Sequence, residues 1–177
     1  LARGIAVMLA FDAGRRSMSL SDVARAVDLP RATARRALHT LNRLGFVDSD
    51  GKQFSLTPKV LRLASTYLGA NGTATILQLA CERISRTVDE ACSAAALDGT
   101  EIVMIAHASP QRFSAAGPGI GFRLPAFCTS LGRVLLASFD DKALSAFLDR
   151  ITRTAATPQT VTDPTALKRR IASVRAQ

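Results

Sequence analysis

The sequence contains no tryptophan, few aromatic residues and no long apolar run. Aromatic residues make up only 5% of the 177 residues, so Leu, Ala, Val and Ile must fill the interior. No apolar run approaches the roughly 20 residues that a membrane-spanning helix needs. The first residues also lack the basic, apolar and small-residue segments of a signal peptide. We therefore expect a cytoplasmic protein without a membrane partner.

Cysteine is also scarce, with only Cys81, Cys92 and Cys128 present. An odd number without a Cys-x-x-Cys pair argues against a disulfide scaffold and against a structural zinc site. No other metal-ligand spacing occurs. We therefore expect neither a metal nor a cofactor.

Acidic residues are sparse in the first third of the chain. The net charge is +9, and residues 1–64 hold eleven Arg and Lys against five Asp and Glu. Residues 65–177 hold twelve against nine. A basic first third is typical of a domain that binds a polyanion, although a merely soluble basic surface would give the same count.

The first residues predict two short helices. Apolar residues between Ile5 and Phe11 predict a helix that ends near Gly14, where glycine can cap it. A second helix follows and is capped by Ser19 or Ser21. The two helices are the first part of a small helical domain.

The next segment predicts a tight corner and a basic helix up to Leu44. Asp28 tolerates the left-handed conformation of a helix-turn-helix corner, and Pro30 suits the first helical position. No acid occurs from Pro30 to Val47, whereas an ordinary solvated helix usually mixes both signs of charge. Small outward residues permit entry into the major groove, where arginine can bond guanine. We therefore predict DNA contacts by Arg31, Ala32, Thr33, Arg35, Arg36, His39 and Arg43.

The residues after this helix predict a hairpin. Gly45 ends the helix, and Asp50-Gly51 is a strong signal for a two-residue turn. Lys52 then lies near the hairpin tip and joins the predicted DNA contacts. Two helices, a recognition helix and a hairpin, in this order, make a winged helix-turn-helix over residues 1–57.

The remaining chain predicts a linker helix over residues 58–72 and a second domain over residues 73–177. Thr57-Pro58 caps the linker helix and starts it, and its apolar stripe can pack on the wing or on a partner chain. It stops before Asn71-Gly72.

The second domain begins with a helix whose inward residues are Leu77, Ala80, Cys81, Ile84 and Val88. A hairpin over residues 92–106 follows. Gly117–Gly121 lacks the G-x-G-x-x-G spacing of a nucleotide loop and predicts a tight turn. With three strands at most and several helices, the α/β layer is thin and the domain looks incomplete.

The segment from Leu124 to Ala137 is the chemical centre of the second domain. A helix that begins near Thr129 leaves its first backbone N–H groups free, and these form an anion site. Thr129, Ser130 and Leu131 would offer N–H groups to a carboxylate. The alternative is that Thr129 is simply a helix cap.

Taken together, several segments resemble the IclR family of bacterial regulators over nearly the whole chain. They are Arg3–Val7, Leu29–Arg36, Leu44–Val47 and Arg123–Arg133. The detail is most similar to the branch that controls aromatic-acid catabolism, which includes PcaR, PcaU and PobR. The resemblance implies a dimer or a dimer of dimers, with a GAF-like α/β effector domain that binds a small organic acid.

The resemblance also implies roles for single residues. The family's recognition helix matches Arg31–His39, and its effector pocket matches Leu124 as an apolar wall. Ser130 and Leu131 match its backbone donors to the ligand carboxylate. The family's domain continues into further strands that supply the other pocket groups, and this sequence ends before them.

Two other classes of protein compete with a regulator. An enzyme would have to use His107, because His39 lies on the basic helix, and nothing near Cys128 activates its thiol. A ligand-independent DNA-binding protein would need no organised second domain. We therefore predict an α+β transcription regulator, not an enzyme, whose binding to double-stranded operator DNA responds to a small carboxylate.

Overall fold

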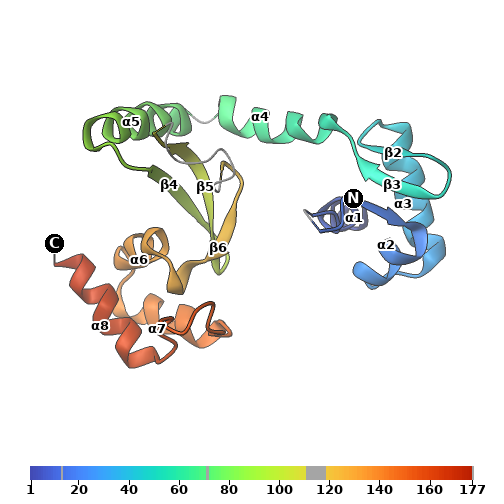
Figure 1. Cartoon of the computed structure of the whole chain (residues 1–177). Helices are drawn as coiled ribbons and strands as arrows, with labels where there is room; N and C mark the ends of the chain where they lie inside the picture. The colour runs from blue at the N-terminus through green and yellow to red at the C-terminus, as the bar shows by residue number, and fades with distance from the viewer. Residues whose placement is uncertain (13, 71, 111–118, 177) are drawn as a thin grey trace. The chain divides into compact units, whose positions relative to one another are not determined.

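The computed structural model describes residues 1–12, 14–70, 72–110 and 119–176 (Figure 1). These residues form two units, Leu1–Tyr67 and Leu68–Gln177, and each unit has its own hydrophobic core. Each unit combines helices with one antiparallel sheet, which confirms the predicted α+β class. No helix in the described ranges is long and apolar enough to cross a membrane.

The first unit is a winged helix-turn-helix. Its elements are α1 (Ala2–Leu9), β1 (Ser17–Ser19), α2 (Leu20–Ala26), α3 (Arg31–Arg43), β2 (Val47–Ser49) and β3 (Gln53–Leu56). The sheet has the order β1-β3-β2, and β2 and β3 form the predicted wing. Val7 of α1, Val23 of α2 and Leu38 of α3 are fully buried and join the three helices in one core.

Local hydrogen bonds explain where these helices begin and end. The Ser19 hydroxyl accepts the N–H of Asp22, and the Asp22 carboxylate accepts the N–H of Ser19, which makes a capping box. Asp28 has a φ of 49°, which confirms the predicted left-handed corner. Gly45 has a φ of 76°, and the N–H of the next residue, Phe46, bonds the carbonyl of Leu41, closing α3 in a Schellman motif.

Four details of the first unit differ from the sequence prediction. Helix α1 ends at Leu9 rather than near Gly14, and beyond its end the Asp12 carboxylate accepts the N–H of Gly14. Pro30 is extended and is the N-cap of α3, one position before the helix. The two central wing residues are Gly51 and Lys52, since the Asp50 N–H bonds the Gln53 carbonyl. Strand β1 was not predicted.

The connection to the second unit is helical. The Thr57 hydroxyl accepts the N–H of Lys59, which confirms the predicted cap, and a 3-10 turn, η1 (Pro58–Val60), precedes α4 (Leu61–Ala70). The predicted boundary at Asn71 lies outside the described residues. No residue of α4 is buried, and its exposed large side chains are Leu61 (65%), Leu63 (58%) and Tyr67 (49%).

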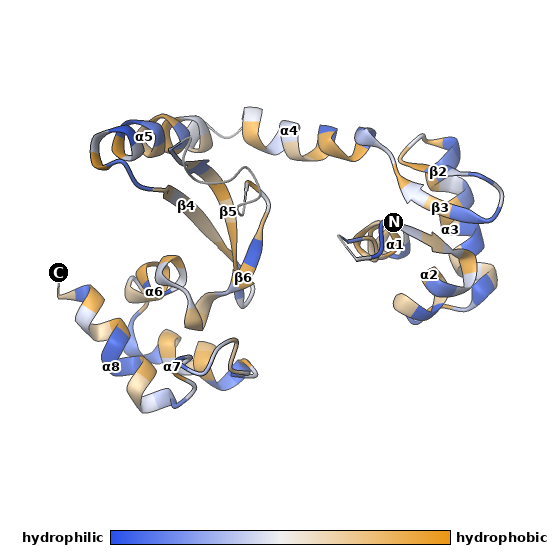
Figure 2. Cartoon of the chain, in the orientation of Figure 1, coloured by the Kyte–Doolittle hydropathy of each residue, from blue (hydrophilic) through white to orange (hydrophobic). Residues whose placement is uncertain are grey.

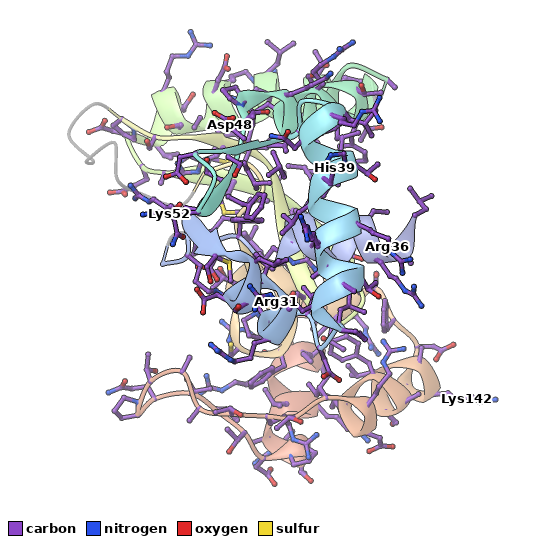
Figure 3. All side chains as sticks on the ribbon, turned by 90° about the vertical axis from the view of Figure 1, so that its right-hand side faces the viewer. Arg31, Arg36, His39, Asp48, Lys52 and Lys142 are labelled. Carbon is purple, nitrogen blue, oxygen red and sulfur yellow. The ribbon has the colours of Figure 1, made fainter. Side chains whose placement is uncertain are left out.

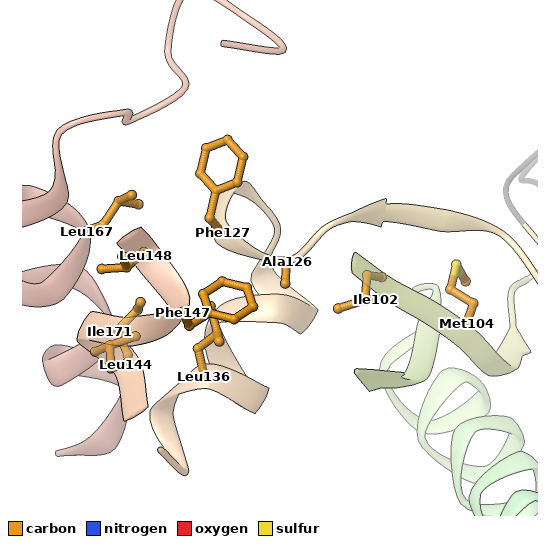
Figure 4. Packing of buried hydrophobic residues seen from close by; sticks show 10 residues of the cluster. All are labelled: Ile102, Met104, Ala126, Phe127, Leu136, Leu144, Phe147, Leu148, Leu167 and Ile171. Carbon is orange, nitrogen blue, oxygen red and sulfur yellow. The ribbon is translucent and has the colours of Figure 1, made fainter. Parts of the chain in front are cut away.

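In the part of the second unit that the structure describes, a three-stranded sheet is combined with the α-helices α5 to α8 and one 3-10 turn. Its elements are α5 (Gly72–Val88), β4 (Cys92–Asp98), β5 (Glu101–Ala108), β6 (Arg123–Pro125), η2 (Ala126–Cys128), α6 (Ser130–Ala137), α7 (Asp141–Arg150) and α8 (Pro164–Arg175). The antiparallel order is β4-β5-β6. Strand β5 is hydrophobic along most of its length (Figure 2), since both of its faces are covered. Met104 packs on one face into a core with α6–α8, and Ile105 on the opposite face contacts α5. Figure 4 shows that core.

The buried face of helix α5 agrees only in part with the predicted one, since Leu77 and Ala80 are half-buried. Cys81 is buried as expected, but Ile84 and Val88 are 45% and 56% exposed. Ala74 and Ser85 are buried in their place. Residues 117–118 of the predicted glycine turn lie outside the described residues, whereas Gly121 has a φ of 86° and belongs to a turn.

Candidate DNA-binding surface and effector segment

Arg31, Arg36 and His39, three of the predicted DNA contacts on α3, lie on its outward side (Figure 3). The opposite side of the helix packs into the core through Ala34, Leu38 and Leu41. Within the described residues, none of the four arginines forms an ion pair or a side-chain hydrogen bond, so their charges are free to meet a polyanion. Thr33 is half-buried, and the exposed residues are Arg31, Ala32, Arg35, Arg36, His39 and Arg43.

A cleft between α3, the wing and the start of α2 brings together residues that are distant in sequence. Its volume is about 1080 Å³, and its lining includes four basic side chains and no acidic one. These four are Arg31, Arg35, Arg36 and Lys52. Lys52 on the wing thus shares one basic concave surface with three arginines of α3.

The wing tip is held by Asp50. Its carboxylate accepts the backbone N–H groups of Gln53 at 2.7 Å and Lys52 at 2.8 Å, which lowers the pKa of Asp50. Gly51 provides a φ of 92° in the same turn. The Asp50 carboxylate is therefore bound by backbone N–H groups of the turn, and the Lys52 side chain remains exposed.

Sequence reasoning missed one basic residue beside this surface. Arg3 of α1 is exposed and lines a groove of about 420 Å³ together with Arg36, Thr33 and Thr40 of α3. Arg36 therefore borders both the cleft and this groove. Only the packing of α1 on α3 reveals the pairing, because the two arginines are far apart in the sequence.

The predicted effector residues span β6, η2 and the first turn of α6. Leu124 on β6 and Leu131 on α6 are half-buried and pack against the same core. The Thr129 hydroxyl accepts the N–H of Gly132 at 3.0 Å, so Thr129 is a helix cap. Ser130 is exposed, and neither its N–H nor that of Leu131 bonds any described residue. Two backbone donors are therefore free at this helix start.

Glycine is required in this turn. A Cβ atom on Gly132 would lie 1.9 Å from the carbonyl oxygen of Ala126, so the first turn of α6 presses directly on η2. This contact fixes the direction in which the free N–H groups point.

Arg123, the residue directly before this segment, is already engaged. Arg123 Nη1 lies 2.8 Å from Asp98 Oδ2, and its Nε lies 2.9 Å from Glu101 Oε2, which raises the pKa of Arg123. A carboxylate at this helix start would therefore depend on backbone donors rather than on Arg123. Burial raises the pKa of the Cys128 thiol, which disfavours a nucleophile here.

Two hollows on the second unit are lined by other residues. One of about 370 Å³ lies between α7 and α8, and one of about 230 Å³ lies between β5 and the start of α5. Neither includes a predicted effector residue. Among the described residues, the free N–H groups of Ser130 and Leu131 therefore lie at the surface. Neither hollow is lined by these residues or by Leu124.

A winged helix-turn-helix with an acid-free recognition helix, followed by a separate α/β unit, defines a two-domain DNA-binding protein. Residues 1–51 match the IclR helix-turn-helix domain, and residues 65–177 match the bacterial transcriptional regulator IclR C-terminal domain. The chain belongs to the IclR family, which confirms the resemblance found in the sequence.

Known relatives agree with this assignment. The Pca regulon regulatory protein of Pseudomonas putida is 43% identical, over 100% of this chain and 61% of its own length. A crystal structure from Rhodococcus sp. RHA1, described as that of a transcriptional regulator, has a TM-score of 0.81 at 44% identity, covering 99% of this chain and 70% of that one. These relatives are regulators by name, a non-enzymatic class, which confirms the prediction that the chain is not an enzyme.

A third relative carries a ligand. It is an IclR homolog from Microbacterium hydrocarbonoxydans complexed with 4-hydroxybenzoate, with a TM-score of 0.78 at 26% identity, covering 99% of this chain and 73% of that chain. The present chain spans 61% of the length of the P. putida regulator, so it represents only part of such a protein's length.

Proposed function

We propose that this chain acts in a cytoplasmic transcription regulator whose binding to double-stranded operator DNA is modulated by a small aromatic carboxylate. Residues 1–57 bind DNA, residues 58–72 form the linker and residues 73–177 hold the effector segment. The observation that carries the proposal is the cleft lined by four basic side chains and no acid. Its direct test is the binding of duplex DNA by variants of these residues.

In this proposal α3 enters the major groove. Its free, exposed arginines can bond guanine edges in bidentate fashion, and the small side chain of Ala32 permits close approach. Thr33, His39 and Arg43 lie along the same helix. Lys52 on the wing meets a phosphate, because its single flexible ammonium suits a point contact.

The effector proposal rests on the free N–H groups of Ser130 and Leu131. A helix N-terminus favours negative charge through these groups and through the helix dipole. The 43% identity to a regulator of the Pca regulon and the 4-hydroxybenzoate bound to a family member support an aromatic acid. Leu124 supplies an apolar wall, and Thr129 positions the turn as its cap.

Two substitutions at Ser130 separate the backbone donor from the side chain. Ser130 is the first residue of α6, where proline is well tolerated. Ser130→Pro deletes one N–H group and should weaken 4-hydroxybenzoate binding by roughly 10- to 150-fold, since a hydrogen bond to a charged group contributes roughly 1.5–3 kcal/mol. Ser130→Ala keeps the N–H group and should bind like the wild type. Calorimetry with 4-hydroxybenzoate and the neutral 4-hydroxybenzamide measures both, and equal affinity for acid and amide would refute the anion site.

We also propose a homodimer, or a tetramer built from dimers. A single winged domain makes few base contacts, and two such domains on a twofold operator provide regulatory specificity. The exposed apolar residues of α4 supply a surface for the partner chain.

Light scattering at micromolar concentration should give the mass of a dimer or larger species. Leu63→Glu places a charge on this apolar surface without touching a core and should shift the protein toward monomer. Arg62→Gln, at another exposed position of α4, serves as the control and should leave the mass unchanged. A monomeric wild type, both free and on DNA, would contradict this proposal.

A further inference from the structure

Cys81 on α5 and Cys92 at the start of β4 both lie where this helix packs on the sheet. The side-chain amide of Gln78 on α5 bonds both the N–H and the carbonyl of His107 on β5, at 3.1 and 3.0 Å. His107 pairs with Ser93, the residue that follows Cys92 at the start of β4. Cys81 lies three residues after Gln78 on the same inner face of α5. This connection places the Cys81 side chain over the beginning of β4.

The two thiols differ in exposure. Cys81 is only 4% exposed, whereas Cys92 is half-buried at a strand end. Burial, followed by the neighbouring thiol of Cys92, raises the pKa of Cys81 to about 11. Cys81 is therefore protonated at neutral pH, and the more accessible Cys92 is the first thiol that an oxidant can reach.

We propose that Cys81 and Cys92 form a reversible disulfide when the protein meets hydrogen peroxide, and that this bond fastens α5 to β4. Stable structural disulfides are rare in a reducing compartment, so a bond of this kind serves as a transient response to an oxidant. Strand β4 also contacts α6, which begins in the proposed effector segment. The bond therefore fixes α5 to the strand that supports this segment.

The chemistry balances with one peroxide per disulfide. The Cys92 thiolate attacks one peroxide oxygen, an S–O bond forms, the O–O bond breaks and the leaving oxygen departs as water. The Cys81 thiol then gives up its proton as its sulfur attacks the Cys92 sulfur; the S–S bond forms, the S–O bond breaks, and the leaving hydroxyl takes that proton and departs as a second water. The two sulfurs together lose two electrons, peroxide gains them, and both thiol protons end in water.

The test treats the dilute 177-residue chain with hydrogen peroxide and maps its peptides by mass spectrometry without reduction. Wild type and Cys128→Ser should each yield a cross-linked peptide pair holding residues 81 and 92, lighter by two hydrogen atoms than the two reduced peptides. Cys92→Ser, at a half-buried position, and Cys81→Ala should both lose this product. Reduction with a dithiol should reverse it.

Thermal melting followed by circular dichroism gives a second measurement. A disulfide that closes a loop of about ten residues should raise the Tm of the peroxide-treated wild type by at least about 4 °C. Cys92→Ser should show no such rise after the same treatment. The proposal fails if Cys92 is oxidised to sulfinic acid or linked to another chain while Cys81 stays free. It also fails if neither thiol reacts under conditions that oxidise an exposed cysteine completely.

Discussion

Replacing Arg36 by alanine should weaken binding to a specific operator duplex by about 1–3 kcal/mol, the usual contribution of a bidentate base contact. Arg36 is exposed, forms no side-chain bond within the described residues and borders both hollows beside the recognition helix. Its removal therefore leaves the fold unchanged. Because a base contact is lost, affinity for random duplexes should fall much less.

Lys52→Ala is the matched comparison for Arg36→Ala. Lys52 lies at the wing tip in the same cleft, and a phosphate contact carries no base information. This variant should weaken specific and random duplexes alike and reduce the salt dependence of binding by about one counterion. Gel-shift titrations of both variants on both duplexes make the distinction. Unchanged specific binding by Arg36→Ala would remove Arg36 from the base-reading residues.

A second large effect is expected at Gly132. Gly132→Ala places a Cβ atom 1.9 Å from the Ala126 carbonyl oxygen, and that atom belongs to backbone rather than to a side chain that can turn away. Overpacking of this kind usually costs about 1–3 kcal/mol and sometimes more, and the backbone contact places this case at the upper end. The first turn of α6 must move off η2, so effector binding should be lost together with stability.

Gly69→Ala is the control for this substitution. Gly69 lies in α4, where a Cβ atom would meet nothing within 4 Å beyond the backbone of its own helix, and alanine favours a helix over glycine by roughly 0.5–1 kcal/mol. Urea unfolding followed by circular dichroism should therefore show a lower midpoint for Gly132→Ala and an equal or higher one for Gly69→Ala. A Gly132→Ala midpoint equal to that of wild type would contradict the close contact between α6 and η2.

The fold of the first unit was largely predictable because its signals are local. Ser19, Asp28 and Gly45 each act through their own backbone or through residues a few positions away, so their types reveal the helix ends. Strand β1 gave no comparable signal. It has three residues, of which only Met18 is buried, and its pairing with β3 depends on a segment more than thirty residues away.

Helix α5 shows how a helix with two apolar sides misleads a periodicity argument. Ile84 and Val88 are larger than Ala74 and Ser85, so hydrophobicity alone favours the wrong face. Helix α5 instead packs on the sheet through its side with smaller residues, from which the Gln78 side chain bonds the backbone of β5. A polar anchor and close packing decide the orientation, and neither is visible in hydropathy.

The two predicted sites differ for a similar reason. The predicted DNA-binding residues lie on one helix and one hairpin, so their side chains could be placed from helical periodicity and a turn signal. The proposed effector site depends on backbone N–H groups, which every residue type except proline supplies, and on apolar walls from distant segments. Sequence could therefore indicate the helix start at Thr129 but not the shape of a pocket around it.

The salt dependence of DNA binding tests the central claim most directly. A labelled duplex is selected from a random pool with the wild-type chain, and its affinity is measured by fluorescence anisotropy over a series of salt concentrations. The charge of α3 is reduced by Arg31→Ala, Arg35→Ala and Arg36→Ala together, and Arg83→Ala with Arg86→Ala on α5 is the control. We expect the triple variant to lose affinity and to show a shallower slope, by about 0.9 for each phosphate contact removed, while the control matches wild type. An affinity and slope of the triple variant equal to those of wild type would contradict DNA binding through this surface.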